Sequence, residues 1–519
     1  MAQALQIFSI SAPGFYGLNT QDSPLDLSAG FALRANNCII DQYGRIGCRK
    51  GYANINASSG NLGANDVGAI HELIESDGTS TVLFAGNNKL FKFDGSNNVV
   101  ELTYGGGGSA PSISANNWSI ATLNNIAYFF QTGHDPLIYD PGVSTTTYRR
   151  VTEKSGYVGT VPSANIVVSA YGRLWAASTS SNKVTVYFSD LLAGHVWSTG
   201  TAGSLDISRV WGNGVDEIQS LAAHNGRLFI FGRNQILVYD NPTTPQDLVQ
   251  SDSIIGTGCI ARDSVKAIGT DILFLSNTGV RSLMRTIQEK SLPFRDLSKN
   301  VRNDLMSIVA TEDLTQIKSV FSEVNAFYLL TLPSVKQIYC FDTRGQLQDG
   351  SSRVTVWDSI NPKSLYSKRN GDLLFGQTGY ISLYSTYRDN GSIYRFQYYT
   401  NHADLGNVAQ TSVLKKLTVV IIGGSSQYVT FKWAFDFDQN YLSDNAFIPT
   451  QGVSEYGIAE YGANASPIAY YSGGIALRTL SVSATGAGKI VQTGYEADID
   501  GDVLSIQKIE IQAKNGKLS

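Results

Sequence analysis

The most constraining feature of the sequence is a hairpin pattern that repeats along most of the chain. Each copy has an apolar strand, a polar turn rich in Gly or Asn, and a second apolar strand that often ends in an aromatic residue and Asp. Periods of about 40–50 residues with several strands each are typical of β-propeller blades. Successive copies lie 43, 48, 54, 45, 55 and 45 residues apart, at Leu83, Ile126, Leu174, Leu228, Leu273, Tyr328 and Leu373.

The strand expected at Arg227–Phe231 is apolar on both faces, with Leu228 and Ile230 on one and Phe229 and Phe231 on the other. A strand with one face in water would alternate apolar and polar residues. Blades stacked around an axis cover both faces of each strand. An array of β-sandwiches is the alternative, but it would not naturally give one unbroken period. We therefore predict an all-β protein with a β-propeller of six or seven blades and a terminal β platform or nozzle domain.

Helical signals are confined to one segment. Val301, Leu305 and Ile308 have helical spacing and follow Ser298, a candidate N-cap. All other segments are expected to be short strands or turns.

The hairpin pattern stops after Asn390, which predicts a domain boundary. Longer strands are expected beyond it, over residues 393–403, 414–423 and 428–437, and a hairpin is expected to turn at Asp500-Gly501. The predicted domains are an N-terminal extended segment and hairpin that packs on the terminal domain (1–60), a β-propeller (61–392), and a C-terminal β domain (393–519) with a mobile insertion near 439–480.

Composition excludes several classes of protein. Hydrophobic residues make up 42% of the chain, which excludes intrinsic disorder. No run of Lys or Arg exceeds two, which argues against tight, sequence-specific nucleic-acid binding. No apolar run approaches the ~20 residues of a membrane span. The N-terminus lacks a basic start and a cleavage signal, so we expect synthesis and folding in a cytoplasm.

Four cysteines do not make a disulfide framework in a chain of 519 residues. Cys38 and Cys48 flank a turn at Gly44 and are placed to face each other across a hairpin. Free buried thiols are expected, because cytosolic proteins rarely form disulfides.

The motifs of known enzymes and metal sites are incomplete. His71-Glu72 begins an H-E-x-x-H zinc motif, but Glu75 stands where the second His is required. The loop before Lys489 lacks the first Gly and the hydroxyl residue of a phosphate-binding loop. The acidic residues Glu496 to Asp502 do not follow the order of a calcium loop. We therefore predict no catalytic residues, no cofactor and no metal.

Several hairpins end in Asp, where the side chain is expected to initiate a turn. A buried pair of these carboxylates would instead indicate a glycosidase. The residues are Asp94, Asp140, Asp190, Asp240 and Asp342.

The segment Ala12–Tyr52 combines an extended lead-in, a Ser23-Pro24 turn and a hairpin that ends in Arg49-Lys50-Gly51-Tyr52. It resembles the N-terminal region of tail nozzle (tail tubular B-type) proteins of short-tailed bacteriophages. Cys48 departs from the pattern of that family. In the family, a chain of this size continues into a β-propeller and closes with further β structure.

The resemblance implies a structural virion protein without enzymatic activity: a homohexameric ring that forms the lower part of the short tail and the channel for genome ejection. The implied partners are a tail adaptor ring protein, tail fibre or needle/tip proteins, and double-stranded DNA in transient, non-specific contact. No small-molecule substrate is implied, and assembly would occur in the bacterial host cytoplasm. The candidate assembly residues are Gly17, Asn19, Gln21, Asp22, Arg45, Arg49 and Lys50.

Two further expectations come from the residues themselves. A channel that releases DNA quickly should be polar to acidic, with Lys and Arg confined to isolated rings, because each neutralised phosphate adds affinity. The alternative function is a carbohydrate-binding or glycan-cleaving propeller with its ligand at the axial funnel.

Overall fold

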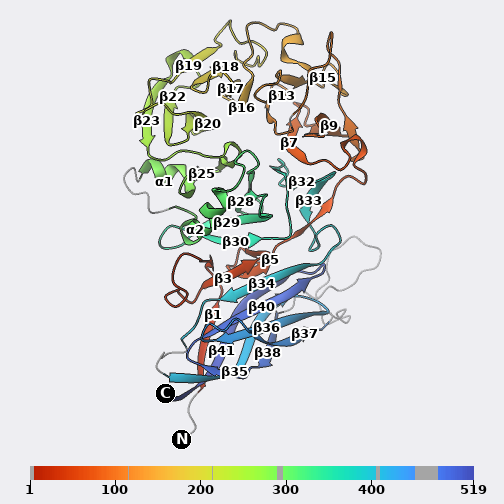
Figure 1. Cartoon of the computed structure of the whole chain (residues 1–519). Coiled ribbons are helices and arrows are strands. Elements are labelled where there is room, and N and C mark those ends of the chain that lie inside the picture. The colour runs from red at the N-terminus through yellow and green to blue at the C-terminus, as the bar shows by residue number, and fades with distance from the viewer. Residues whose placement is uncertain are drawn as a thin grey trace. The chain divides into compact units, whose positions relative to one another are not determined.

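The computed structural model describes residues 5–114, 116–212, 214–288, 296–404, 410–449 and 477–518, which are mainly β (Figure 1). The chain divides into two compact units. Unit 1 comprises residues 1–53, 338–360 and 385–519, and unit 2 comprises residues 54–337 and 361–384. Within the described ranges, no helix is long and apolar enough to cross a membrane.

Unit 2 is a six-bladed β-propeller, and all seven repeat positions found in the sequence lie within it. The blades follow one another along the chain. The first three are β7 (Val67–Ile74) to β10 (Val99–Glu101) with β8 (Ser80–Gly86) and β9 (Lys89–Phe93); β11 (Thr103–Tyr104), β12 (Ser119–Leu123), β13 (Ile126–Phe130), β14 (Leu137–Tyr139) and β15 (Thr147–Arg150); and β16 (Ala164–Ala170), β17 (Arg173–Thr179), β18 (Thr185–Phe188) and β19 (Gly203–Asp206).

The last three blades complete the unit. They are β20 (Ile218–His224), β21 (Arg227–Gly232), β22 (Gln235–Asp240) and β23 (Val249–Ile255); β24 (Lys266–Ile268), β25 (Asp271–Ser276) and β26 (Gly279–Ser282); and β31 (Ser364–Ser367), β32 (Leu373–Gly376), β33 (Ile381–Ser385) and β6 (Gly51–Asn54).

One end strand of each blade takes part in a closed ring of contacts around the propeller axis. In this ring β7, β12, β16, β20 and β24 contact one another in order, and β31 contacts β7. The hairpin of β27 (Ser319–Ser322) and β28 (Phe327–Leu332) occupies a seventh place, since β27 contacts both β24 and β31. The ring places one edge of each of these strands next to the axis.

Strand β21 illustrates why the blades stack. Leu228 and Ile230 pack in one buried cluster with β17 residues such as Trp175. Phe229 and Phe231, on the opposite face, pack in another cluster with residues of β25. The two-faced apolar pattern read from the sequence therefore reflects burial between two neighbouring blades.

The two ends of unit 2 meet at its last blade. The backbone N–H of Ile55 donates to the carbonyl of Ile381 at 2.8 Å. The N–H of Ile381 donates to the side-chain oxygen of Asn56 at 2.9 Å. Phe84 of the first blade and Leu374 of the last share one buried cluster. These contacts close the ring.

The predicted helix is present as α2 (Arg302–Val309), which buries Leu305 and Val309. Ser298 does not cap it by a side-chain hydrogen bond, because its hydroxyl accepts the backbone N–H of Val280 at 3.0 Å. Sequence analysis missed the short helix α1 (Leu283–Gln288). Turns of 3-10 helix span Gly60–Leu62, Val151–Glu153, Pro245–Asp247, Arg262–Ser264 and Lys299–Val301.

Unit 1 contains two β-sheets. Its first and last chain segments contribute strands to both sheets, and residues 338–360 contribute strands to the second. In the first sheet the order is β38 (Leu477–Ser483), β35 (Gln410–Gly423), β41 (Leu504–Leu518), β5 (Ile46–Cys48) and β4 (Cys38–Ile40), with β1 (Leu5–Ser11) on β41 and β39 (Ala487–Gly488) on β35.

The second sheet of unit 1 has its N-terminal strands in the middle. After β27 and β28, the order is β29 (Gln337–Gln346), β30 (Ser352–Trp357), β2 (Gly17–Leu18), β3 (Phe31–Asn36), β34 (Tyr394–Thr400), β40 (Val491–Ile499), β36 (Gln427–Phe435) and β37 (Leu442–Ile448). The division between the two units falls within β6 (Gly51–Asn54), after Ala53. The strands expected over residues 393–403, 414–423 and 428–437 are present as β34, β35 and β36.

The division into units differs from the expected boundaries at residues 338–360, which we placed in the propeller. The reason is pairing: β29 pairs with β30, and β30 pairs with the N-terminal strands β2 and β3. Most of the insertion expected near 439–480 falls on residues 450–476, outside the described residues. The parts on either side belong to β37 and β38.

The prediction that the strands on either side of Asp500-Gly501 pair as a hairpin is wrong. The chain does turn there, with Gly501 at φ 95°. However, β40 lies between β34 and β36, whereas β41 pairs with β35, β1 and β5. Both edges of each strand are already occupied, so the two consecutive strands belong to different sheets.

Candidate functional site

The propeller contains a central cavity of about 220 Å³. All seven inner strands, or the residues directly before them, contribute to its lining. Most of the lining is apolar or hydroxyl-bearing, but one side carries a group of charged residues: Arg262, Asp263, Lys266 and Lys318, here called the axial cluster.

Asp263 is the only carboxylate among the residues that line this cavity, and two cations bind it. Nε and Nη2 of Arg262 donate to its two oxygens at 2.8 and 2.9 Å. Nζ of Lys318 donates to Oδ2 at 2.5 Å. Arg262 and Asp263 lie on the 3-10 turn before β24, and Lys318 directly precedes β27, so the pairing joins adjacent places in the ring.

Two asparagines extend the axial cluster to other blades. Arg262 Nη2 donates to Oδ1 of Asn117 at 2.8 Å, and Nη1 donates to Oδ1 of Asn165 at 3.0 Å. Lys318 Nζ also donates to Asn117 Oδ1. The guanidinium is thereby fixed by planar, charge-assisted hydrogen bonds in more than one direction.

Electrostatics keeps this group charged in spite of its burial. Burial opposes ionisation of Asp263, but Arg262 and Lys318 outweigh it and hold the pKa of the carboxyl well below its usual range. Burial lowers the pKa of Lys318 to about 8, against the attraction of Asp263. Both partners are therefore mostly ionised at neutral pH.

Lys266, on β24, is in a different position from Lys318. No hydrogen bond or ion pair among the described residues engages its ammonium group, although it lines the cavity. Burial lowers its pKa, Asp263 opposes the shift, and Arg262 adds to it. Three cations thus face one carboxylate, and the lining carries two positive charges in excess.

His71 also lines the cavity, from β7. Its Nε2 lies 2.7 Å from the hydroxyl of Thr122, and its ring contacts that of Tyr366 at 5.7 Å between centroids. Burial lowers the pKa of His71 to about 4, so the ring is neutral at pH 7.

A second, polar pocket of about 560 Å³ is also lined by Arg262. Its charged residues include Lys183 and Glu217, which form an ion pair at 3.0 Å. Amide and hydroxyl side chains make up most of the remaining lining: Asn117, Gln131, Thr132, Asn165, Ser178, Thr179, Ser180, Gln219, Thr315 and Gln316.

The candidate residues of the N-terminal lead-in organise a turn in unit 1. The side-chain oxygen of Asn19 accepts the backbone N–H groups of Gln21 and Asp22 at 3.0 and 3.2 Å, and its amide donates to the Asp22 carboxylate. Asn19 is fully buried, whereas Gln21 and Asp22 are exposed. Gly17 has φ 83°, and a Cβ there would lie 2.6 Å from the carbonyl oxygen of Val354. The chain needs glycine at this close approach.

The candidate basic residues lie in different environments. Arg45 forms an ion pair with Asp41 at 2.8 Å and stacks on the exposed ring of Tyr43. Lys50 is half-buried. Arg49 is fully buried, and its guanidinium binds both oxygens of Asp389 at 2.8 and 2.7 Å.

Arg49 connects all three chain segments of unit 1. Its Nε donates to Asn37 Oδ1 at 3.0 Å, and its Nη2 donates to the hydroxyl of Ser359 at 2.5 Å. The ring of Tyr394 lies 4.1 Å from the guanidinium carbon. The positive charge of Arg49 is compensated by the bidentate pair with Asp389 and by the aromatic face of Tyr394. Arg49 is therefore a buried structural residue that links the three chain segments of unit 1.

The predicted hairpin around Gly44 is confirmed, with Cys38 directly opposite Cys48 in β4 and β5. Both thiols are free and buried. Burial raises the pKa of Cys48 to about 11, so this thiol is un-ionised and poorly reactive at neutral pH.

The hairpin-terminal aspartates have structural roles. Asp94 accepts the backbone N–H groups of Ser96 and Asn98, both at 2.8 Å, as expected of a turn-initiating residue. Asp140 and Asp240 pair instead with Lys154 and Arg227, and Asp190 accepts the N–H of Thr201. Asp342 accepts the N–H of Arg344 and belongs to unit 1.

Glu496, considered above for calcium, is surrounded by donors rather than by further acids. Arg395 and Lys432 pair with it at 2.5 and 3.1 Å, and the hydroxyl of Tyr399 donates to it at 2.5 Å. Burial opposes its ionisation, but these donors lower its pKa to about 2. In the part of the chain that the structure describes, no group of three or more His, Cys, Asp or Glu side chains is placed to hold a metal ion.

Replacing Glu496 by Gln should make unit 1 less sensitive to acid. Because the pKa of Glu496 in the folded state lies below its ordinary value, the ionised carboxylate stabilises the folded unit above about pH 4.5. This stabilisation is lost as the pH falls through about 2, and a pKa shift of this size corresponds to about 3 kcal/mol of unfolding free energy. Wild type and E496Q should therefore differ at pH 7 and converge below pH 2. Urea titrations with hydrogen exchange of β34 and β40 peptides measure this. Asp498→Asn, at an exposed partner of the same Arg395, is the control and should change little.

Sequence analysis did not single out the axial cluster. The available signal was positional, because Arg262, Asp263, Lys266 and Lys318 lie at the start of two successive inner strands. The hairpin repeat places such positions near the axis, but the two groups are separated by more than fifty residues in the chain.

Comparisons with known proteins give only fold-level likenesses. No protein-family profile and no curated protein matches the chain. The WD40 β-propeller domain of Doa1 has a TM-score of 0.38 and 12% identity, covering 64% of this chain and 96% of that one. Virginiamycin B lyase from Staphylococcus aureus has a TM-score of 0.36 and 10% identity, covering 64% and 97%. PorZ, a surface component of the type-IX secretion system of Porphyromonas gingivalis, has a TM-score of 0.34 and 11% identity, covering 65% and 42%.

Proposed function

We propose that the chain is a structural virion protein, the nozzle ring that forms the lower part of a short phage tail and its channel for genome ejection. The observation that carries the proposal is how the N-terminal segment, which resembles that of tail nozzle proteins, is built into unit 1. Within that segment, Ala12–Tyr52, β5 pairs with the start of β41, β2 pairs with β30, and β3 pairs with β34. A propeller joined to a β unit of this construction is the architecture that the resemblance implies.

Exposed apolar strand edges in unit 1 support a role in assembly. Within the described residues, β1 pairs only with β41, and β37 pairs only with β36. Ile7 on β1 is 61% exposed, and Tyr428 and Phe447, which contact each other on β36 and β37, are 60% and 47% exposed. Unprotected edges with apolar side chains favour pairing with another chain. We propose that these edges meet neighbouring subunits of a homohexamer.

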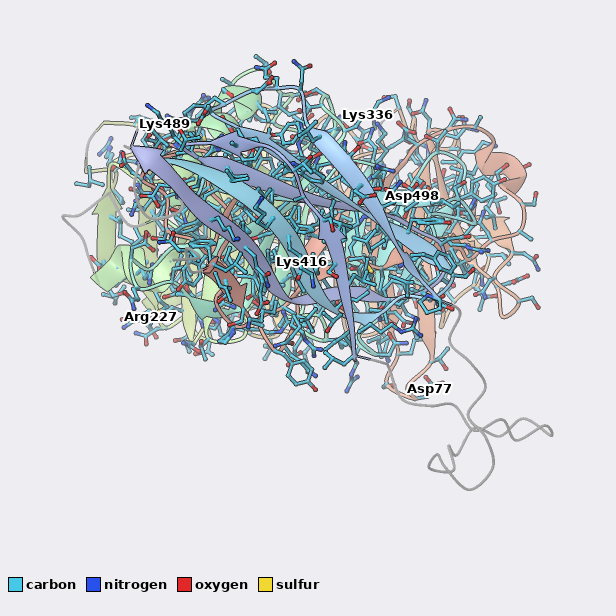
Figure 2. The ribbon with its side chains drawn as sticks, turned by 90° about the horizontal axis from the view of Figure 1, so that it is seen from below. Asp77, Arg227, Lys336, Lys416, Lys489 and Asp498 are labelled. Carbon is cyan, nitrogen blue, oxygen red and sulfur yellow. The ribbon has the colours of Figure 1, made fainter. Side chains whose placement is uncertain are left out.

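The proposed partners follow from the same assignment: a tail adaptor ring protein, fibre or needle/tip proteins, and passing double-stranded DNA. Unit 1 carries exposed charges of both signs: Lys416, Lys489 and Asp498 all reach solvent (Figure 2). The proposed contact with DNA is weak and non-specific, in a lumen that is polar to acidic, because each neutralised phosphate would add affinity. The proposal includes no enzymatic activity and places the protein in the virion after assembly in the host cytoplasm.

The polar pocket favours a second candidate function, carbohydrate binding. Its amide and hydroxyl side chains offer both donors and acceptors, which sugar hydroxyls require. In this alternative the protein acts as a single propeller with its ligand at the axis.

Mass photometry of the purified full chain separates the two functions. The nozzle assignment predicts particles of about six times 56.1 kDa, formed by the chain alone or on addition of other tail proteins. A species of one subunit mass that binds or trims surface polysaccharide would support the carbohydrate function and contradict the nozzle.

A further inference from the structure

We propose that the axial cavity of the propeller binds a small multivalent oxyanion of the phosphate class, held by Lys266 and attracted by the neighbouring positive charges of Arg262 and Lys318. This site is separate from the assembly role proposed above and does not depend on it. All of its residues belong to unit 2.

The balance of charge in the cavity supports this proposal. Both carboxylate oxygens of Asp263 already accept hydrogen bonds. Oδ1 accepts from Arg262 Nε, and Oδ2 accepts from Arg262 Nη2 and Lys318 Nζ. No carboxylate of the lining is left to compensate Lys266. An unpaired cation in such surroundings is costly, because its hydration is reduced and no counter-ion replaces it. A dianion would neutralise the two excess positive charges of the lining.

The space and the donors also fit a small oxyanion. The cavity of about 220 Å³ is several times the ~30 Å³ that one water molecule occupies in the liquid. Strands β7, β16, β20, β24 and β31 are each the terminal strand of their blade, so one edge of each is free of ladder pairing within that blade. Backbone N–H groups at such edges, with the Lys266 ammonium, can surround an anion with donors.

Isothermal titration of the full chain with sodium phosphate tests the site. Wild type should bind with a Kd of about 1 mM or tighter, and Lys266→Met should bind at least about tenfold more weakly, the effect of losing one charge-assisted hydrogen bond. Lys336→Met is the matched control, since Lys336 is an exposed cation of the same unit (Figure 2) and should bind as wild type.

Thermal unfolding of unit 2 gives a second readout. Phosphate should raise the midpoint of wild type and of K336M more than that of K266M at the same concentration. In phosphate-free buffer K266M should melt above wild type, because an uncompensated cation is gone. If K266M does not fold, Lys266→Gln takes its place in both measurements. The proposal would be overturned if wild type did not bind phosphate, or if the Lys266 variant bound it as tightly as wild type. It would also be overturned if sodium chloride at matched ionic strength raised the melting midpoint as much as phosphate does.

Discussion

Deleting residues 1–50 will unfold unit 1 and leave the propeller folded. The deletion removes β3 from the interior of one sheet and β4 and β5 from the other. It also removes Phe15, Cys38 and Ile46, all fully buried in the core cluster of unit 1. Loss of a buried Phe or Ile side chain alone costs about 2–5 kcal/mol, so losing these side chains together with three strands is comparable to the whole stability of a typical domain, about 5–15 kcal/mol. None of these strands belongs to a blade.

Hydrogen exchange followed by mass spectrometry measures this outcome. Peptides of β35 and β41 should exchange as in an unfolded chain, whereas peptides of β13 and β21 should keep their protection. Deletion of residues 1–11 alone is the control: it removes only the edge strand β1 and should leave β35 protected. Retained protection of β35 and β41 in the longer deletion would show that unit 1 does not need its N-terminal strands.

Replacing Arg49 by Met will destabilise unit 1 by about 3–5 kcal/mol, the cost of leaving one buried charge of a pair without its partner. The uncompensated group is Asp389, which is 8% exposed. Arg49→Met also removes the hydrogen bonds to Asn37 and Ser359 that join the chain segments. The effect should appear as a lower urea midpoint for exchange of β34 peptides.

Arg45→Met provides a matched control from the same hairpin. Its ion pair with Asp41 is partly exposed and joins two residues of one turn, so its loss should cost less than that of the Arg49–Asp389 pair, in which Arg49 is fully buried. Combining Arg49→Met with Asp389→Asn should cost less than the sum of the two single changes, because the pair is then lost together. Equal effects of Arg45→Met and Arg49→Met would contradict the internal role assigned to Arg49.

The propeller could be predicted because its signal is local and repeated. Leu228 and Phe229 show on their own that a strand is buried on both faces, and the spacing of seven such hairpins indicates a ring. The extent of each unit could not be predicted. Residues 338–342 have the pattern of a blade strand and belong to β29, which lies beside β28 as the hairpin pattern indicates, but β29 also pairs with β30, and residues 338–360 belong to unit 1.

The residues of the candidate sites show the same limit. The sequence marks Arg45 and Arg49 alike as basic residues of one hairpin, but only the distant Asp389 makes Arg49 an internal residue. Lys266 and Lys318 are isolated lysines in the sequence. Ring closure brings them to one cavity, and that depends on contacts between inner strands that no local pattern records.

Electron microscopy of the purified full chain, alone and mixed with adaptor-ring protein, tests the nozzle assignment most directly. Class averages viewed down the symmetry axis should show a closed ring of six subunits around an open channel, each subunit containing one propeller. Averages that show only single propellers under both conditions, with polysaccharide bound at the propeller axis, would contradict the assignment.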